Sequence, residues 1–296
     1  MLAACPNVDR LSLNLFPTAN PSEAMEQMAS TIGDWMDSRT FRCLRIFFDN
    51  HNDFLLAQVL RGQMKTPVLD LATRPDSYDR ANSSDAFLGL PACQALARVH
   101  GVQVFTADCA IRSKYLEESE LTKNWSIVEI ASLPPDGCGI LWAALVPLLQ
   151  LHAKTIESLR IEHELDVDEI EIAISSPIPG RTLVLPRLTK LENVVAIPSL
   201  LVPSESRGST ILDLLHPTTP VEFLRNHLNT ESIKSLCDFI KAQDPPRLRR
   251  IEVCARVRID RNFGDLPTEE QSATLKALCE AKGIELEDPH CVEYTR

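Results

Sequence analysis

A six-residue pattern of apolar and polar positions recurs along the chain at intervals of 25 to 33 residues. It reads apolar, two variable residues, apolar, one variable residue, apolar. Six segments match it in full: VDRLSL (8–13), FRCLRI (41–46), VHGVQV (99–104), WSIVEI (125–130), IESLRI (156–161) and LRRIEV (248–253). Four more match with one small or polar substitution: TPVLDL (66–71), LTKLEN (188–193), TTPVEF (218–223) and AKGIEL (281–286). The regular interval indicates an internal repeat whose pattern segments are strands.

Helical periodicity fills several of the intervals between these strands. Five stretches are expected to be helical: Ser22–Asp37, Asn52–Gly62, residues 140–151, Asn229–Gln243 and Thr268–Lys282. The first of them carries Met25, Met28, Ile32 and Trp35 at helical spacing. The last should begin with Thr268 and Gln271 as a capping box and end at Gly283. Strand–helix alternation at this interval predicts that each repeat is one supersecondary unit, which buries its apolar face against its neighbours.

The predicted strands are apolar on one face only. Because alternate residues of a strand point to opposite faces, the last two apolar positions of each segment should face inward, and the residue between them outward. All ten outward residues are polar: Ser12, Arg45, Asp70, Gln103, Glu129, Arg160, Glu192, Glu222, Glu252 and Glu285. A sheet with helices on both faces has nearly continuous apolar strands instead. We therefore predict an α/β fold, a leucine-rich-repeat-like solenoid (horseshoe) with a parallel sheet on its concave face and helices on its convex face. Its roughly ten irregular repeats should form a single domain over residues 1–296.

Four segments resemble the leucine-rich-repeat region of F-box proteins, especially the large fungal set: CPNVDRLSLNL, LPRLTKLENV, PPRLRRIEVCA and LKALCEAKGIELED. In that family the repeats recruit a substrate protein, and a separate N-terminal F-box binds the adaptor of a cullin–RING ubiquitin ligase. The resemblance therefore implies substrate recognition. The chain has no Leu-Pro-x-Glu F-box signature, and its first repeat begins at Val8, which leaves no room for an F-box. The adaptor is expected as a partner only if an F-box lies upstream of Met1.

Charge, apolar content and cysteine usage indicate the cellular environment of the protein and the class of partner that it binds. The net charge of −11 disfavours nucleic acid and anionic membranes as partners, since phosphate neutralisation supplies most nucleic-acid affinity. The longest apolar stretch, Ile140 to Leu149, is about half as long as a membrane-spanning helix requires. Nine cysteines without motif spacing, and an N-terminus without secretory features, favour free thiols in a cytoplasmic or nuclear protein.

The sequence shows no pattern of a catalytic residue, a metal site or a cofactor site. Nucleophile-elbow, phosphate-loop, dinucleotide-binding and zinc-protease motifs are missing from it. Cys279, His290 and Cys291 are poorly spaced for one tetrahedral ion. His163 lies between two glutamates without a nucleophile pattern, and the acidic stretch 166–171 lacks EF-hand spacing. The function predicted is non-enzymatic protein–protein interaction; the alternative is a compact α/β enzyme without a recognisable catalytic motif.

Two features of the predicted open face suggest how a protein partner would bind. From Glu129 onward its outward row is mostly glutamate, which would receive a basic segment of the partner, although glutamates also keep an exposed sheet soluble. The residue after each inward pair also faces outward, so Phe47 and Phe105 should flank Ala72 in a shallow apolar slot, which a loop or a preceding segment would otherwise cover. These three residues and the outward row from Arg45 onward form the predicted partner-binding surface.

Overall fold

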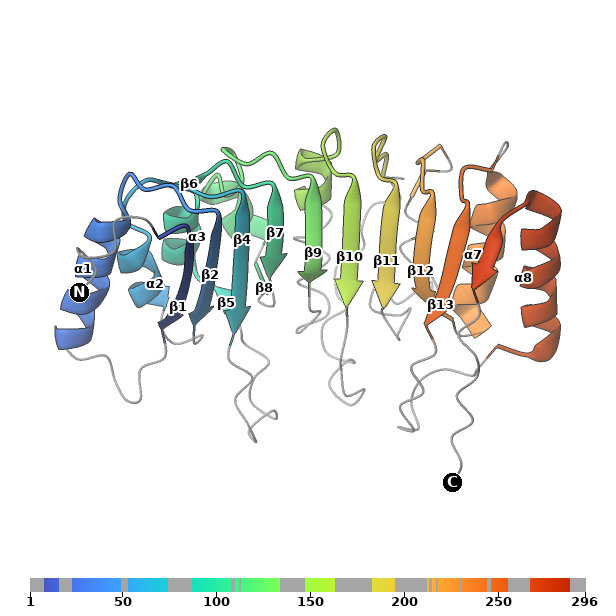
Figure 1. Ribbon diagram of the computed structural model, residues 1–296, viewed down its shortest axis with the longest axis horizontal. Helices are drawn as coiled ribbons and strands as arrows, with labels where there is room; N and C mark the ends of the chain where they lie inside the picture. The colour runs from blue at the N-terminus through green and yellow to red at the C-terminus, as the bar shows by residue number, and fades with distance from the viewer. Residues whose placement is uncertain are drawn as a thin grey trace, which may run out of the picture. The chain divides into compact units, whose positions relative to one another are not determined.

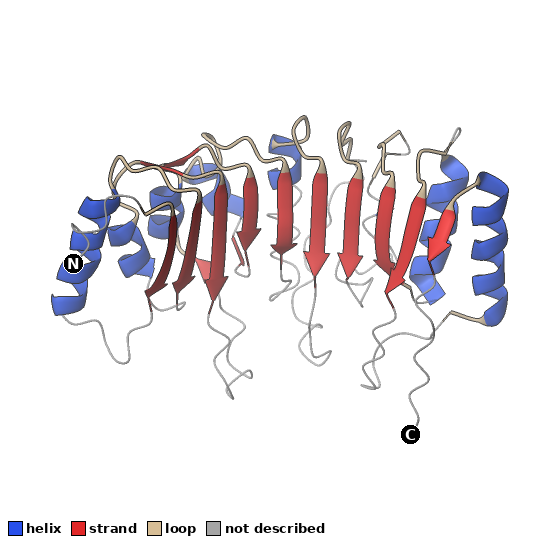
Figure 2. Ribbon diagram, in the orientation of Figure 1, coloured by secondary structure: helices blue, strands red, loops and turns tan. Residues whose placement is uncertain are grey.

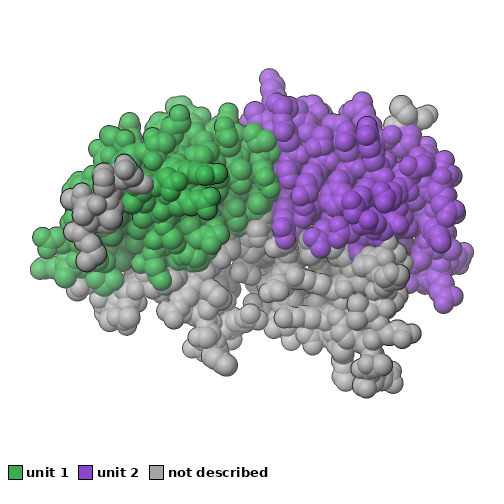
Figure 3. Space-filling view, viewed as in Figure 1, with its two compact units in different colours: residues 1–148 green, residues 149–296 purple. Residues whose placement is uncertain are grey.

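The computed structural model divides the chain into two compact units, residues 1–148 and 149–296 (Figure 3). Each unit is described by itself. The residues that the structure describes are 8–15, 23–48, 53–73, 87–107, 110–111, 113–133, 147–162, 183–194, 212, 215–216, 218–228, 230–243, 246–254 and 267–287. His163, the acidic stretch 166–171, His290 and Cys291 lie outside these ranges.

Unit 1 contains five parallel strands paired side by side in the order β1-β2-β4-β7-β9 (Figure 1). The strands are β1 (Arg10–Leu15), β2 (Cys43–Phe48), β4 (Val68–Thr73), β7 (Val104–Ala107) and β9 (Glu129–Leu133). Between them come α1 (Glu23–Met36), α2 (Asp53–Val59), α3 (Leu90–Leu96) and α4 (Ser113–Glu118). Two short parallel pairs join successive repeats away from this sheet: β3 (Met64–Lys65) with β6 (Val99–His100), and β5 (Phe87–Leu88) with β8 (Ala110–Ile111).

Unit 2 repeats the arrangement with five parallel strands in the order β10-β11-β12-β13-β14. They are β10 (Ser158–Glu162), β11 (Lys190–Val194), β12 (Phe223–His227), β13 (Arg250–Cys254) and β14 (Glu285–Glu287). Its labelled helices are α7 (Thr230–Ala242) and α8 (Glu269–Lys282), and a further helical turn covers residues 147–151 at the boundary of the units. The predicted α/β class with parallel strands is thus confirmed.

In the view of Figure 2 no described helix lies in front of the strands of either unit; α3 lies behind them, and α1 and α8 lie beside β1 and β14. Burial alternates accordingly along β2, where Leu44, Ile46 and Phe48 are fully buried while Arg45 is exposed and Phe47 half-buried. In unit 2, Leu159, Leu191, Leu224 and Ile251 form the corresponding buried layer, and they are paired across neighbouring strands. The one-sided strands that the sequence predicts are therefore present in both units.

A backbone hydrogen-bond pattern recurs one residue before several strands of the sheets. The carbonyl oxygen of Glu157 accepts from the N–H groups of Thr189 and Lys190 at 3.0 and 3.1 Å. The carbonyl oxygen of Glu222 likewise accepts from Arg249 and Arg250, at 2.8 and 3.2 Å. In unit 1 the corresponding acceptors are the carbonyl oxygens of Asp9, Pro67 and Gln103. Equivalent residues of successive strand–helix units thus meet in the same way, as expected of a repeat.

Local signals set several helix boundaries. The Oγ1 atom of Thr268 accepts from the Gln271 N–H, and the Gln271 side chain accepts from the Thr268 N–H, which completes the predicted capping box of α8. Gly283 ends this helix at φ +69°, in the left-handed region. Helix α1 has the predicted extent, but its buried side is Ala29, Gly33 and Met36, whereas Met28 is exposed. A Cβ on Gly33 would lie 2.5 Å from the Gln58 carbonyl oxygen, so this glycine allows α1 and α2 to approach closely.

Candidate partner-binding surface

The outward face of unit 1 carries apolar side chains on β2, β4 and β7, whereas β1 presents polar ones. Strand register places the side chains in rows, which are Arg10–Cys43, Val68–Val104–Glu129, Ser12–Arg45–Asp70–Thr106–Ala131 and Asn14–Phe47–Ala72. Arg10, Ser12, Asn14 and Arg45 are exposed, and the others are half-buried. We call Val68, Val104, Phe47 and Ala72 the apolar patch. Apolar side chains gathered on the side of a sheet that no described helix covers are typical of surfaces that bind another protein.

The ion pair of Arg45 and Asp70 lies between the two halves of the apolar patch. Arg45 donates from Nε to the carboxylate of Asp70, its partner on the neighbouring strand. The Arg45 guanidinium carbon also lies 5.8 Å from the ring centroid of Phe47. The predicted outward positions of Arg45, Asp70, Phe47 and Ala72 are therefore confirmed, and the structure brings these four residues together.

Phe105 does not belong to this surface. It is 1% exposed, pairs with the buried Leu69, and its ring lies 5.2 Å from that of Trp125. The prediction that Phe105 faces outward is wrong, because β7 is aligned with β4 through Phe105 rather than through Val102. The outward neighbours in β7 are instead Val104 and Thr106. The slot between Phe47 and Phe105 is therefore not formed.

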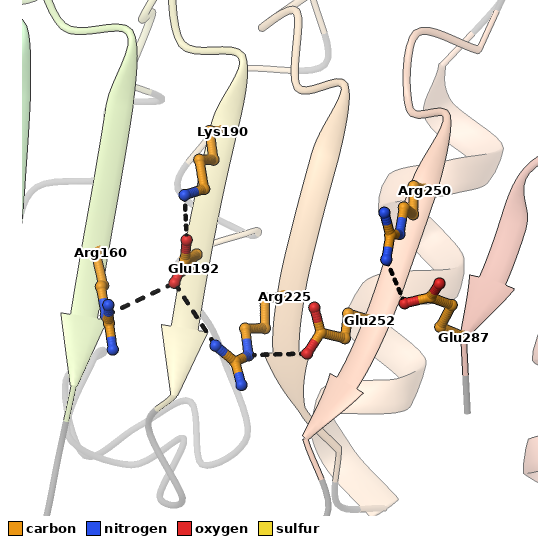
Figure 4. Close-up of polar contacts among 7 residues, drawn as sticks. All are labelled: Arg160, Lys190, Glu192, Arg225, Arg250, Glu252 and Glu287. Carbon is orange, nitrogen blue, oxygen red and sulfur yellow. Dashed lines mark hydrogen bonds and ion pairs between the residues drawn. The ribbon is translucent and has the colours of Figure 1, made fainter. Parts of the chain in front are cut away.

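Charged side chains dominate the outward face of unit 2 (Figure 4). Its first row is Ser158–Lys190–Phe223–Arg250–Glu285 and its second is Arg160–Glu192–Arg225–Glu252–Glu287. Positive and negative side chains alternate along the second row, apart from the two glutamates at its end. Neighbours of opposite charge on adjacent strands attract each other, so this arrangement stabilises the pairing of the strands.

Glu192 is the centre of the charged rows. Its side chain is only 8% exposed, and its carboxylate oxygens lie 2.5 Å from Lys190 Nζ, 3.6 Å from Arg160 Nε and 3.9 Å from Arg225 Nη1 (Figure 4). The three cationic side chains are 37 to 49% exposed. Arg225 Nε also lies 3.3 Å from Glu252. The three cations thus cover the Glu192 carboxylate, and their side chains are the ones exposed to solvent here.

The predicted acidic row of unit 2 is wrong. Glu222 was expected between Glu192 and Glu252, but Arg225 occupies that position, since Leu191 pairs with Leu224 and not with Val221. Glu222 instead lies exposed before β12, where its backbone joins the recurring hydrogen bonds. Glu285 faces outward but in the first row, paired with Arg250, while Glu287 occupies the predicted position. The reason for expecting a basic partner segment along the whole row is therefore removed.

Two predicted residues of unit 1 are shifted in the same way. Gln103 is exposed but precedes β7, and its backbone carbonyl accepts from the N–H groups of Val128 and Glu129. Glu129 faces outward in the row of Val104, one position before the row of Arg45. The remaining predicted residues, Arg160, Glu192 and Glu252, take the expected positions.

Sequence reasoning missed several residues of the surface. They are Val68, Val104 and Thr106 in unit 1, and Lys190, Phe223, Arg225, Arg250 and Glu287 in unit 2. For Val68, Lys190 and Arg250 a signal was available, because each lies two residues before a correctly placed outward residue. The others required the correct register of β7, β12 and β14.

The buried thiols and the buried histidine of the described residues lie away from this surface. Within the described ranges, no group of three His, Cys, Asp or Glu side chains is arranged to hold a metal ion. Burial raises the pKa of the Cys279 thiol to about 11 and also raises that of Cys237, so both thiols remain protonated at neutral pH. Burial lowers the pKa of His152. None of the three lies on the outward face of a sheet.

Comparisons with known proteins leave the family open. No protein-family model, curated protein or solved structure matches the chain. Among the helices that the structure describes, none is long and apolar enough to cross a membrane.

Proposed function

We propose that this chain is a protein-binding α/β repeat protein, and that it binds its partner on the outward face of the sheets. The observation that carries the proposal is the apolar patch of unit 1, where Val68, Val104, Phe47 and Ala72 stay half-buried on the side of the sheet opposite the helices. Apolar side chains at such positions contribute little to the core. They gain by being removed from water when another protein covers them.

The recurring backbone hydrogen bonds support a solenoid of the leucine-rich-repeat type. Glu157, Thr189, Glu222 and Arg249 are linked one to the next through their backbones, each just before a strand of unit 2. Such translational repetition distinguishes stacked repeats from an α/β enzyme whose crossovers cover both faces of the sheet. We propose a horseshoe-like stack on this basis.

The resemblance to the repeats of F-box proteins suggests a biological role for this binding. In that reading the outward face recognises a substrate protein for ubiquitin ligation. The cullin–RING adaptor is included as a partner only for a product that carries an F-box before Met1. The proposed activity is recognition, without catalysis and without a cofactor.

Affinity capture with matched surface variants tests the proposal. The first variant combines Val68→Lys and Val104→Lys on the outward face. The control combines Met28→Lys and Phe54→Lys, which add the same charge at apolar helix residues that are 56 and 47% exposed. Both should keep the wild-type circular dichroism spectrum and melting temperature to within a few degrees.

We expect proteins captured by the wild-type chain and by the helix control to be lost with the outward-face variant. A captured protein, once purified, should bind the outward-face variant at least roughly tenfold more weakly, the effect of about 1.4 kcal/mol. Partners that are retained by the outward-face variant but lost with the helix control would overturn the proposal.

A further inference from the structure

The charges on the outward face of unit 2 are sorted by strand. Among the side chains that the structure describes on β10, β11 and β12, Arg160, Lys190 and Arg225 face outward together with one carboxylate, Glu192. Strands β13 and β14 present the opposite balance, with Arg250 against three carboxylates, which are Glu252, Glu285 and Glu287. Among the described outward side chains of unit 2, the face therefore has a positive part and a negative part.

In the positive part, the carboxylate is more deeply buried than the cations, so a partner would contact mainly positive charge. The one carboxylate there is 8% exposed, whereas Arg160, Lys190 and Arg225 are 41, 49 and 37% exposed. Three cations around one covered carboxylate leave an excess of positive charge at the surface. This excess occurs in a chain whose net charge is −11, so it runs against the general balance of the protein.

An aromatic residue marks the middle of the first row. Phe223 is half-buried on β12, paired with Lys190 on one side and Arg250 on the other. The Arg250 guanidinium carbon lies 5.8 Å from its ring centroid, and Arg250 is held by Glu287 at 2.5 Å. The ring therefore gives the face an apolar contact point between two cations, and a half-buried aromatic is a suitable anchor for a bound chain.

We propose that this face binds an extended segment of the partner protein whose acidic end lies over β10–β12 and whose basic end lies over β13–β14. The inference deepens the proposed function and rests on it, since it specifies the chemistry of the partner. Adjacent strands lie about 4.8 Å apart, so five strands span roughly 19 Å, which about six extended residues can cover. Complementary charge at both ends would fix the direction of the segment and speed its association.

Two peptides of identical composition test the charge order. The first is Glu-Glu-Glu-Gly-Gly-Lys-Lys-Lys, and the second is Glu-Lys-Glu-Gly-Gly-Lys-Glu-Lys, both with blocked termini and a fluorescent label. Binding to the full chain is measured by fluorescence anisotropy at about 10 mM ionic strength, where the screening length is about 30 Å. The segregated peptide should bind more tightly than the alternating one, and its advantage should disappear at about 1 M salt.

Charge-reversed variants locate the site. Lys190→Glu should weaken binding of the segregated peptide by roughly three- to tenfold, as expected for the loss and reversal of one exposed charge interaction. Lys190→Gln should give a smaller loss, which keeps the test valid if the glutamate variant is unstable. Lys234→Glu, at an exposed position of α7, makes the same change of net charge elsewhere in unit 2 and should leave binding unchanged.

Equal binding of the two peptides, or equal losses in Lys190→Glu and Lys234→Glu, would overturn the inference. Its failure is distinguishable from failure of the proposed function. A partner that is lost with the Val68→Lys, Val104→Lys variant but insensitive to Lys190→Glu would leave the proposed function standing and remove the charge-ordered segment. A partner retained by all these variants would remove the proposed function itself.

Discussion

Neighbouring residues of one strand have opposite environments in this protein, and their energetic roles differ accordingly. Phe47 and Phe48 follow each other in β2, yet Phe48 is fully buried and Phe47 is half-buried beside Arg45. Phe105 belongs with Phe48, because it packs beneath the sheet against Trp125. Trp125 in turn donates from its indole nitrogen to the Val99 carbonyl oxygen at 2.8 Å. Removing a ring from this inner layer should leave a cavity.

Phe105→Ala should therefore lower the free energy of unfolding by about 3–5 kcal/mol, as is typical of a buried phenylalanine. Phe47→Ala should lower it by less than about 1 kcal/mol, since its ring is partly solvated and lines no core. Urea titration followed by circular dichroism measures both. Similar losses for the two variants would mean that the assignment of inward and outward residues is wrong.

His152 gives the folded protein a dependence on pH. It is buried, and within the described residues its Nε2 atom has no hydrogen-bond partner. Burial lowers the pKa of the folded-state imidazole below its ordinary value of 6.5. Between the folded and unfolded pKa values the unfolded chain binds more protons than the folded one. Stability therefore rises with pH in this window and is lost as the pH falls below about 6.5.

We expect His152→Gln to lose less stability than the wild-type chain between pH 7 and pH 5.5. The contribution of one histidine has a maximum slope of about 1.4 kcal/mol per pH unit. Urea unfolding of both chains at several pH values measures the difference, and the carboxylates common to both cancel in the comparison. Parallel stability curves for the two chains would exclude His152 as the source.

At the level of elements, the boundaries follow local sequence more closely than the register does. The capping box of α8 is confirmed because Thr268 and Gln271 act within one turn, and the alignment of β2 with β4 through Leu44 and Leu69 is confirmed as well. The register failed where two overlapping segments fit the apolar pattern. Both VHGVQV and VQVFTA match it, and only the packing of Phe105 beneath the sheet selects the second.

The register of β12 is ambiguous in the same way. VEFLRN matches the pattern with one polar residue, Asn226, at its third apolar position, and Asn226 is 1% exposed. The overlapping segment TTPVEF also matches with one polar residue, Thr218, so the pattern alone does not decide between them. A buried asparagine is accommodated by tertiary contacts, which the order of apolar residues does not reveal. The wrong register also gave a wrong site residue, because it predicts Glu222 beside Glu192, where the structure has Arg225.

Thr268→Ala tests the importance of the α8 cap. It should lower the free energy of unfolding by about 1 kcal/mol, because the Gln271 N–H loses its acceptor. Ser272→Ala, at an exposed position of the same helix, is the control and should be neutral or slightly stabilising. Thermal unfolding of the two variants measures the contrast. A Thr268→Ala variant as stable as the control would show that the helix end is held by packing alone.

At the scale of the whole molecule, the two units share the same backbone arrangement but differ in the side chains of their outward faces. Recurring hydrogen bonds before the strands are shared by both, whereas the outward face carries the apolar patch in unit 1 and mostly charged side chains in unit 2. The recurring apolar–polar pattern predicted a one-sided sheet because the alternation of apolar and polar residues is a local property. It did not predict which unit carries the apolar patch, since that depends on the register of every strand. A protein-binding function requires that the outward face of each unit be accessible to a partner.

Hydroxyl-radical footprinting with mass spectrometry measures that accessibility directly in the unmodified protein. If the outward faces are open, Phe47 and Phe223 should be oxidised clearly faster than Phe48 and Phe105, which are at most 1% exposed. The comparison of Phe47 with Phe48 is the sharpest, because the two residues share one peptide and one strand. Equal protection of Phe47, Phe223, Phe48 and Phe105 would show that both faces of the sheets are covered. That result would contradict an open binding face and favour a compact α/β enzyme instead.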